Sequence, residues 1–179
     1  MLRNLQIKDA ELMYEWMCDD TVLKGLQAHA YKNKTIEDCI KFINESNDEA
    51  ASTINCHMAI VDESDVYQGT VSLKRIDHDY KDAEFALVLR RKAQKHGYAQ
   101  AAMKEIMELA FTKYELDEVY WNVLKNNELA IRLYTRGGYK KLEKVSERRM
   151  ADIPRRADGK AEDVLFFGIT KDAYFDMHN

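Results

Sequence analysis

The sequence predicts one α/β domain, in which a mixed sheet of six or seven strands carries about four helices distributed over both faces. The first observation is a near-continuous apolar run, Ala83–Leu89, which is typical of a buried strand. The second is the run Tyr98–Phe111, where apolar residues recur at helical spacing. A further apolar run, Val119–Leu124, completes a strand–helix–strand unit, whose two strands are expected to be parallel.

Length and composition set the bounds. A chain of 179 residues is long enough for one domain with a real core, and we expect a single domain over residues 1–179. Hydrophobic residues make up 46% and charged residues 32%, an ordinary globular balance. The net charge of −4 argues against nucleic acid as a main partner, and no apolar run approaches the roughly 20 residues of a membrane span.

The cysteines and histidines indicate neither disulfides nor metal. Cys18, Cys39 and Cys56 contain no C-x-x-C pair and are odd in number, which favours a reduced protein in the cytoplasm. Cys39 and Cys56 are interpreted as core residues rather than nucleophiles, because the neighbouring His57 is expected to face away from Cys56 on a strand. The five histidines show no tight ligand spacing, so we expect no metal.

The N-terminal part alternates strand and helix patterns. Leu2–Ile7 reads as a half-buried strand, and Asp9 is placed to cap a helix that ends near Met17. Asp19–Lys34 has weak periodicity and is expected to be a loop or a broken helix. A capping box at Thr35–Asp38 then opens a second helix, whose apolar face comprises Ile36, Cys39, Ile40 and Ile43.

A hairpin leads into the central strand. Ala50–Thr53 is a connector, and strands at His57–Asp62 and Gln68–Ile76 flank the turn Glu63–Asp65. The acidic stretch Asp77–Asp82 is expected to be a solvated turn, with attraction of a cationic substrate as the alternative.

The C-terminal part ends on a strand. Residues Lys140–Met150 alternate polar and apolar side chains as far as Pro154, the single proline. The polar loop Arg155–Asp163 precedes the expected last strand, Val164–Thr170.

The loop between the central strand and its helix has a chemical meaning. A helix start carries unpaired backbone N–H groups and the positive end of the macrodipole. Gly97 and Ala99 allow close approach to that backbone, and Arg90, Arg91 and Lys95 add positive charge. This indicates a phosphate site, although the loop is neither a Walker loop nor a dinucleotide fingerprint, and an ordinary turn is the alternative.

The order of motifs resembles the GNAT family of N-acetyltransferases. The motif Gln94-x-x-Gly97-x-Ala99 is followed by a strand, by Asn127-x-x-Ala130-x-x-x-Tyr134, and by Gly138-Tyr139. The likeness runs from Leu2 to about Tyr174 and looks closest to the ribosomal-protein, polyamine and amino-sugar acetyltransferases. Small departures from the family pattern are Ala99 for the second glycine, Tyr139 for phenylalanine and the extra glycine Gly137.

The resemblance implies acetyl-CoA as co-substrate. It assigns backbone groups of Leu87, Val88 and Leu89 to the pantetheine arm, and Asn127 to that arm or to the splayed end of the strand, with a helix N-cap as a compatible role. A backbone N–H near Val88 would stabilise the developing oxyanion. The phosphates would be bound by the loop residues Gln94, Lys95, His96, Gly97, Tyr98, Ala99 and Gln100.

The same resemblance implies two catalytic residues. Glu84, the only charge in its strand, is the expected base, with a pKa raised by partial desolvation; the alternative is an ion-pair partner. Tyr134 is the expected acid for the departing thiolate, and the alternative is a packing role.

The acceptor stays open at this stage. It is expected to be a primary amine of a small molecule, such as a polyamine or amino sugar, or a protein N-terminus, and a homodimer is left open. Trp16, Tyr31 and the Arg155–Asp163 loop lie where the family builds its acceptor pocket. The alternatives are a coenzyme A sensor without turnover and an RNA-associated protein that uses Arg90–His96.

Overall fold

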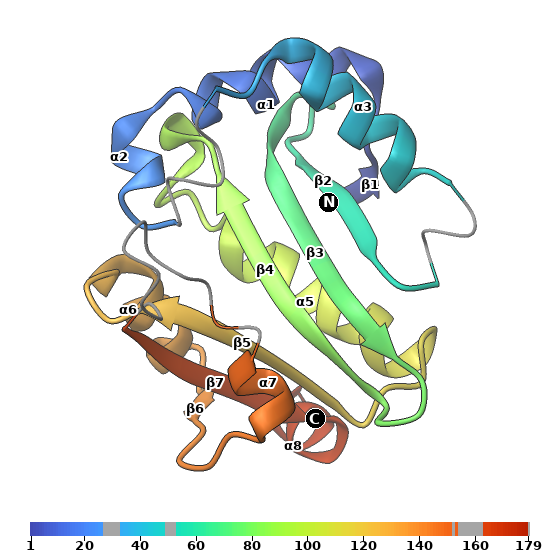
Figure 1. Ribbon diagram of the computed structural model, residues 1–179, viewed down its shortest axis with the longest axis vertical. Coiled ribbons are helices and arrows are strands. Elements are labelled where there is room, and N and C mark those ends of the chain that lie inside the picture. Colours follow the sequence, from blue (N-terminus) through green and yellow to red (C-terminus); the bar gives the residue numbers. More distant parts are fainter. Residues whose placement is uncertain (27–32, 49–52, 152, 154–162, 179) are drawn as a thin grey trace.

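The computed structural model describes residues 1–26, 33–48, 53–151, 153 and 163–178. Seven strands form one sheet in the order β1-β2-β3-β4-β5-β7-β6 (Figure 1). Only β4 and β5 run parallel; every other neighbouring pair is antiparallel. The mixed sheet predicted from the sequence is therefore confirmed. The strands are β1 (Leu2–Asn4), β2 (Cys56–Val61), β3 (Tyr67–Asp77), β4 (Asp82–Leu89), β5 (Glu118–Leu124), β6 (Lys140–Lys141) and β7 (Val164–Thr170).

Helices α1 and α3 arch over the face of the sheet that points toward the viewer in Figure 1. Their apolar side chains pack with those of β2 and β3 into one cluster that includes Met13, Trp16 and Ile43. The Thr35 capping box is present, since Thr35 and Asp38 exchange backbone-to-side-chain hydrogen bonds of 3.2 and 2.9 Å. The elements of this part are the 3-10 helix η1 (Ile7–Asp9), α1 (Ala10–Met17), α2 (Asp20–Leu23) and α3 (Ile36–Ser46).

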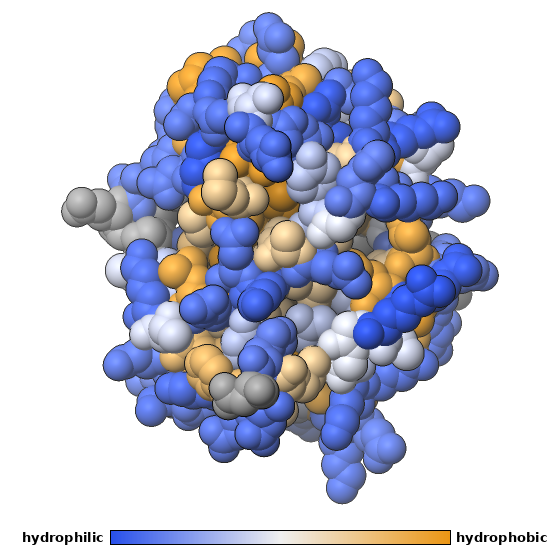
Figure 2. All heavy atoms as spheres, turned by 180° about the vertical axis from the view of Figure 1, so that it is seen from behind, coloured by the Kyte–Doolittle hydropathy of each residue, from blue (hydrophilic) through white to orange (hydrophobic). Residues whose placement is uncertain are grey.

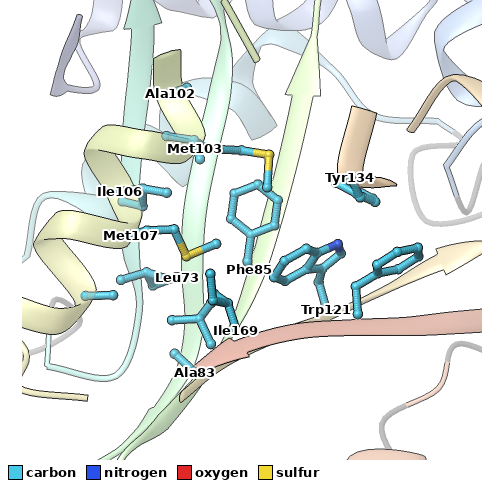
Figure 3. Close-up of a cluster of buried hydrophobic side chains, with 14 of the residues drawn as sticks. Leu73, Ala83, Phe85, Ala102, Met103, Ile106, Met107, Trp121, Tyr134 and Ile169 are labelled. Carbon is cyan, nitrogen blue, oxygen red and sulfur yellow. The ribbon is translucent and has the colours of Figure 1, made fainter. Parts of the chain in front are cut away.

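The larger core lies on the other face. Helix α5 (Tyr98–Thr112) turns Ala102, Met103, Ile106 and Met107 toward the sheet (Figure 3). Figure 2 shows this back face, where hydrophilic side chains surround the apolar residues that remain visible. Burial of so many apolar groups is the main term that stabilises the fold. The remaining helices are the 3-10 helix η3 (Arg91–Ala93), α6 (Glu128–Arg136), α7 (Glu147–Ala151) and α8 (Lys171–His178).

Two expectations for the N-terminal part are wrong. The first strand stops at Asn4 rather than Ile7, because the carboxylate of Asp9 accepts the backbone N–H of Gln6 and bends the chain into η1. The same carboxylate therefore does not cap α1. The alternating stretch Lys140–Met150 contains the short strand β6 and most of the helix α7.

The C-terminal helix α8 was missed, since its eight residues give little periodicity. Its Tyr174 is buried against Phe111, with ring centroids 5.3 Å apart, so tertiary packing holds it. Several residues named in the sequence analysis lie outside the described residues. They are Tyr31, residues 50–52 of the expected connector, Pro154, and residues 155–162 of the expected polar loop. Within the described chain, no helix is long and apolar enough to cross a bilayer.

Candidate active site

The parallel pair β4 and β5 forms a fork. Their register comprises Asp82↔Glu118, Ala83↔Val119 and Glu84↔Tyr120, and among the described residues no pair follows. The opposite edge of β4 stays paired with β3 as far as Leu89. One edge of Phe85–Leu89 therefore keeps backbone N–H and C=O groups without a strand partner, as an edge strand does. The predicted pantetheine contacts Leu87, Val88 and Leu89 lie on this segment.

Aromatic rings fill the space where β4 and β5 begin to diverge. Trp121, the first residue of β5 beyond the paired part, packs edge-to-face against Phe85 at 5.3 Å and against Tyr134 at 5.2 Å (Figure 3). Tyr139 and Phe167 pack on the same indole. Such large side chains separate the strands where the ladder ends. The fork is thus a consequence of core packing.

Tyr134 lies beside the point where the two strands diverge. It is delivered by α6, the helix that follows β5, and its side chain is buried among rings. Burial raises the pKa of its hydroxyl, so the phenol keeps its proton at neutral pH. Its hydroxyl has no hydrogen-bond partner among the described residues, which leaves the proton available to a ligand in the fork. The role of acid stays a prediction.

Asn127 joins two segments at the open end. Its side-chain oxygen accepts the backbone N–H of Ala130 at 3.2 Å, so it is the N-cap of α6. Its amide nitrogen donates to the backbone oxygen of Gly25, after α2, at 2.9 Å. A Cβ on Gly25 would lie 2.8 Å from that nitrogen, so a larger residue there would push the Asn127 amide aside. The amide keeps a second N–H for a ligand.

The loop before α5 has the form of an anion site. Gly97, the N-cap, has φ +85°, and a Cβ there would meet nothing within 4 Å. No side chain caps the helix, so the N–H groups of its first turn face outward without an intrahelical partner. Lys95 and His96 are exposed beside them. The backbone and charge therefore fit a phosphate group.

Arg90 does not belong to this charge cluster, contrary to the sequence interpretation. Its guanidinium is buried, forms an ion pair with Glu15 at 2.8 Å and donates to the backbone oxygen of Tyr67 at 3.0 Å. The ion pair therefore connects the end of β4 to α1. Arg91, Lys92 and Lys95 remain exposed.

Glu84 occupies the last paired position before the fork opens. It points to the α1/α3 face, because its neighbour Phe85 packs under α5 and side chains alternate along a strand. Its buried carboxylate pairs with Lys74 at 3.1 Å and with Arg75. The ion pair named as the alternative is thus present, and the role of base stays a prediction.

A pocket of about 310 Å³ lies on the same face, and we call it the front pocket. It lies between α1, α3 and strands β2 to β4, and Trp16, which was expected to lie near the acceptor, is part of its wall. Its lining residues are Met13, Trp16, Met17, Leu26, Lys34, Asp38, Cys39, Phe42, His57, Thr70, Ser72, Lys74, Ala86, Leu87 and Val88.

Sequence reasoning missed His57 as a pocket residue. Its Nδ1 lies 2.7 Å from the hydroxyl of Ser72, and its ring packs edge-on against Phe42 at 4.9 Å. Burial, and secondarily the charge of Lys74, lowers its pKa to about 4, so the imidazole is neutral at pH 7. The signal was available, because His57 and Ser72 are polar residues at inward positions of paired strands.

The opposite end of the β4–β5 pair holds an ionic cluster. Asp82 is 2% exposed and pairs with both Arg148 and Arg149, and Arg149 also pairs with Glu118 at 2.6 Å. Arg149 lies over the ring of Tyr120 at 4.2 Å. The expected solvated turn therefore ends in a buried carboxylate, because α7 brings two guanidinium groups to it.

Comparisons with known proteins point to the same family along most of the chain. The family model described as acetyltransferase (GNAT) domain matches residues 1–140. The uncharacterized N-acetyltransferase p20 of Bacillus licheniformis is 26% identical over 174 residues, covering 97% of this chain and 93% of that protein. Spermidine N(1)-acetyltransferase of Escherichia coli strain K12 is 37% identical over 71 residues, 40% of this chain and 38% of that protein.

The solved structures agree with the fold. Spermidine N-acetyltransferase from Vibrio cholerae in complex with CoA and spermine superposes with a TM-score of 0.77 and 19% identity, covering 98% of this chain and 97% of that one. At this identity the likeness concerns the fold. The matched part of the chain includes the fork, the loop before α5 and Asn127.

Proposed function

Because the chain is a member of the GNAT acetyltransferase family, we propose that it transfers an acetyl group from acetyl-CoA to a primary amine of a small molecule. The amine attacks directly, within a complex that holds both substrates. No covalent enzyme intermediate is needed, since a thioester is already electrophilic. The spermidine acetyltransferases among the relatives support an amine acceptor without identifying it.

The fork is the observation that carries this proposal. A pantetheine arm would bind the free edge of Leu87–Leu89 as an added strand does, using main-chain hydrogen bonds. The N–H groups at the start of α5, with Gly97 and Lys95, would bind the phosphates. Acetyl-CoA, when bound, supplies the activated acetyl group. The residues of the chain orient both substrates and move the protons.

The two faces of the sheet divide the proton transfers. Glu84 lies on the face of the front pocket, whereas Tyr134 packs in the core on the α5 side. An amine that enters from the front pocket would lose its proton to Glu84, directly or through water. Tyr134 would protonate the thiolate from the opposite side. Deprotonating a lysine-like amine costs roughly 4 kcal/mol at neutral pH, which a positioned base offsets.

A thiol-release assay across a panel of amines tests the activity. Polyamines, monoamines, amino-sugar nucleotides and N-terminal peptides serve as acceptors, and calorimetry measures coenzyme A binding in parallel. We expect binding together with acceptor-dependent thiol release. Coenzyme A binding without release for any amine would instead identify a sensor. Retention on heparin without coenzyme A binding would favour the RNA-associated alternative.

Replacing Glu84 by Gln tests the base. The variant keeps the shape of the side chain, so it is expected to be slow at pH 7 and to recover at high pH, where the amine is deprotonated in solution. An acceptor of low pKa should suffer less than an alkylamine. An equal loss at every pH and for every acceptor would mean that Glu84 positions substrate through its pairs with Lys74 and Arg75.

A further inference from the structure

The charges in the front pocket do not suit a polycation. Among its described lining residues two ammonium groups, those of Lys34 and Lys74, accompany a single carboxylate, that of Asp38. Sites that bind several ammonium groups need carboxylates to replace the water that each cation loses. The described lining residues therefore carry more positive than negative groups, whereas a polyamine requires an excess of carboxylates.

The nearby carboxylates are also already engaged. Asp38 accepts the backbone N–H of Thr35 at 2.9 Å as part of the cap of α3. Glu84, which is not a lining residue, pairs with the lining residue Lys74 and with Arg75. A second or third ammonium group in the pocket would have to displace one of these partners, and the displaced group would then be left unpaired.

The rest of the wall is apolar and partly aromatic. Trp16, Phe42, Met13 and Met17 offer ring and thioether surfaces. The hydroxyl of Ser72 is engaged with His57 at 2.7 Å. The hydroxyl of Thr70 is engaged with Tyr67 at 2.7 Å. The two hydroxyl groups of the wall thus already have hydrogen-bond partners, and the surface left for a ligand is mostly hydrophobic.

The pocket and the fork share one strand. Ala86, Leu87 and Val88 line the pocket and also belong to the segment of β4 whose edge is free. A molecule whose body fills the pocket would therefore place one end beside this strand. Neutral His57 adds no cation to repel that end.

We infer that the acceptor is an arylalkyl monoamine, whose apolar body fills the front pocket and whose single amino group reaches β4. A volume of about 310 Å³ suits a body of one aromatic ring with a short alkyl chain. This inference rests on the proposed function, because it names the acceptor for the same acetyl transfer. It separates this chain from relatives named for spermidine.

The test compares 2-phenylethylamine with spermidine in the thiol-release assay. We expect kcat/KM for 2-phenylethylamine to exceed that for spermidine by about tenfold or more, since pocket contacts of this kind discriminate over that range. A higher value for spermidine would overturn the inference alone. Absence of thiol release with any amine would overturn the proposed function, and the inference with it.

Two variants locate the selectivity in the pocket. Phe42→Ala removes half-buried aromatic wall and should lower kcat/KM for 2-phenylethylamine about tenfold, with a smaller effect on spermidine. Met17→Glu adds a carboxylate and should shift the preference toward spermidine about tenfold. Val66→Ala and Val66→Glu are the matched controls, because Val66 is exposed in the β2–β3 turn.

The result is read from ratios of acceptors, which a general loss of folding does not change. Circular dichroism melting curves show which variants fold. If the ratio for folded Phe42→Ala and Met17→Glu equals that of the Val66 controls, the acceptor does not occupy the front pocket and the inference is wrong.

Discussion

The two ends of the β4–β5 pair are built in opposite ways. At the closed end three backbone pairs and the buried Asp82, clamped by Arg148 and Arg149, hold the strands together. At the open end the ladder stops, and rings around Trp121 keep the strands apart. Rigidity is concentrated where no ligand is expected. The free backbone groups lie where a ligand could pair with them.

The energetic reason for this division lies in solvation. A buried carboxylate needs partners to offset its lost hydration, and Oδ2 of Asp82 pairs with two guanidinium groups, although Oδ1 has no hydrogen-bond partner among the described residues. Unpaired backbone groups cost little while water can reach them, and three of the five residues of the open segment Phe85–Leu89, namely Ala86–Val88, are only partly buried. The closed end can therefore stabilise the fold, while the backbone groups of the open end stay free to bind a ligand. The following experiments break or sharpen this contrast.

Tyr134→Phe is expected to have the largest effect, at the open end. Removing the hydroxyl should lower kcat by about 10²–10⁴-fold, the usual scale of acid catalysis, while acetyl-CoA binding stays nearly intact. Tyr139→Phe is the matched control, since Tyr139 packs on the same indole at the same 5.2 Å centroid distance. Similar kcat for both variants would reduce Tyr134 to a packing residue.

Asp82→Asn attacks the closed end. Two arginines would lose their shared buried carboxylate, so the free energy of unfolding should fall by about 3 kcal/mol. Urea denaturation measures this loss. Asp79→Asn, at an exposed position of the same turn, should change stability by less than about 0.5 kcal/mol. Equal losses in the two variants would contradict the clamp.

Gly97→Glu separates ligand binding from stability. A negative side chain beside the first N–H groups of α5 should weaken coenzyme A binding by about 100-fold in calorimetry. Gly97→Asn controls for backbone strain, because asparagine tolerates the left-handed conformation at φ +85° without adding charge. If the two variants bind equally well, the phosphates lie elsewhere.

His57 is expected to give the smallest effect at neutral pH, because its contribution to stability changes only in acid. Its folded pKa of about 4 lies below its ordinary 6.5, so the unfolded chain binds the proton first as pH falls. The contribution of His57 to stability should be constant above pH 6.5 and should then decline by at most about 1.4 kcal/mol per pH unit down to pH 4. His57→Gln should remove that part of the slope.

Urea titrations at several pH values make the measurement. His78→Gln, at an exposed position, should keep the wild-type slope. An unchanged slope in His57→Gln would mean that the imidazole is protonated in the folded pocket.

The sheet and its main helices could be predicted because their signals are local. The apolar run at Ala83–Leu89 and the periodicity of Tyr98–Phe111 survive in the structure almost unchanged. The fork could be expected only from the family resemblance, since no local pattern shows where two strands part. Its cause is the set of rings that β5, α6 and β7 bring to Trp121.

Charged residues were the least predictable part of the site. Arg90 looked like a phosphate ligand because its neighbours are basic, yet its partner Glu15 lies 75 residues earlier. Glu84 looked like the only charge of its strand, and Lys74 faces it from the adjacent strand. Partners across a sheet are set by register, which spacing along one strand does not reveal.

If coenzyme A and the acceptor bind in the fork and in the front pocket as proposed, the hydrogen bond from Asn127 to Gly25 would couple the two sites thermodynamically. Asn127 lies where the fork ends, and Gly25 immediately precedes Leu26, a residue of the front pocket. A ligand in the fork that binds the Asn127 amide would also alter the hydrogen bond from Asn127 to Gly25, which adjoins the pocket wall. Linkage of this kind is reciprocal, so whatever one substrate does to the affinity of the other is returned in equal measure.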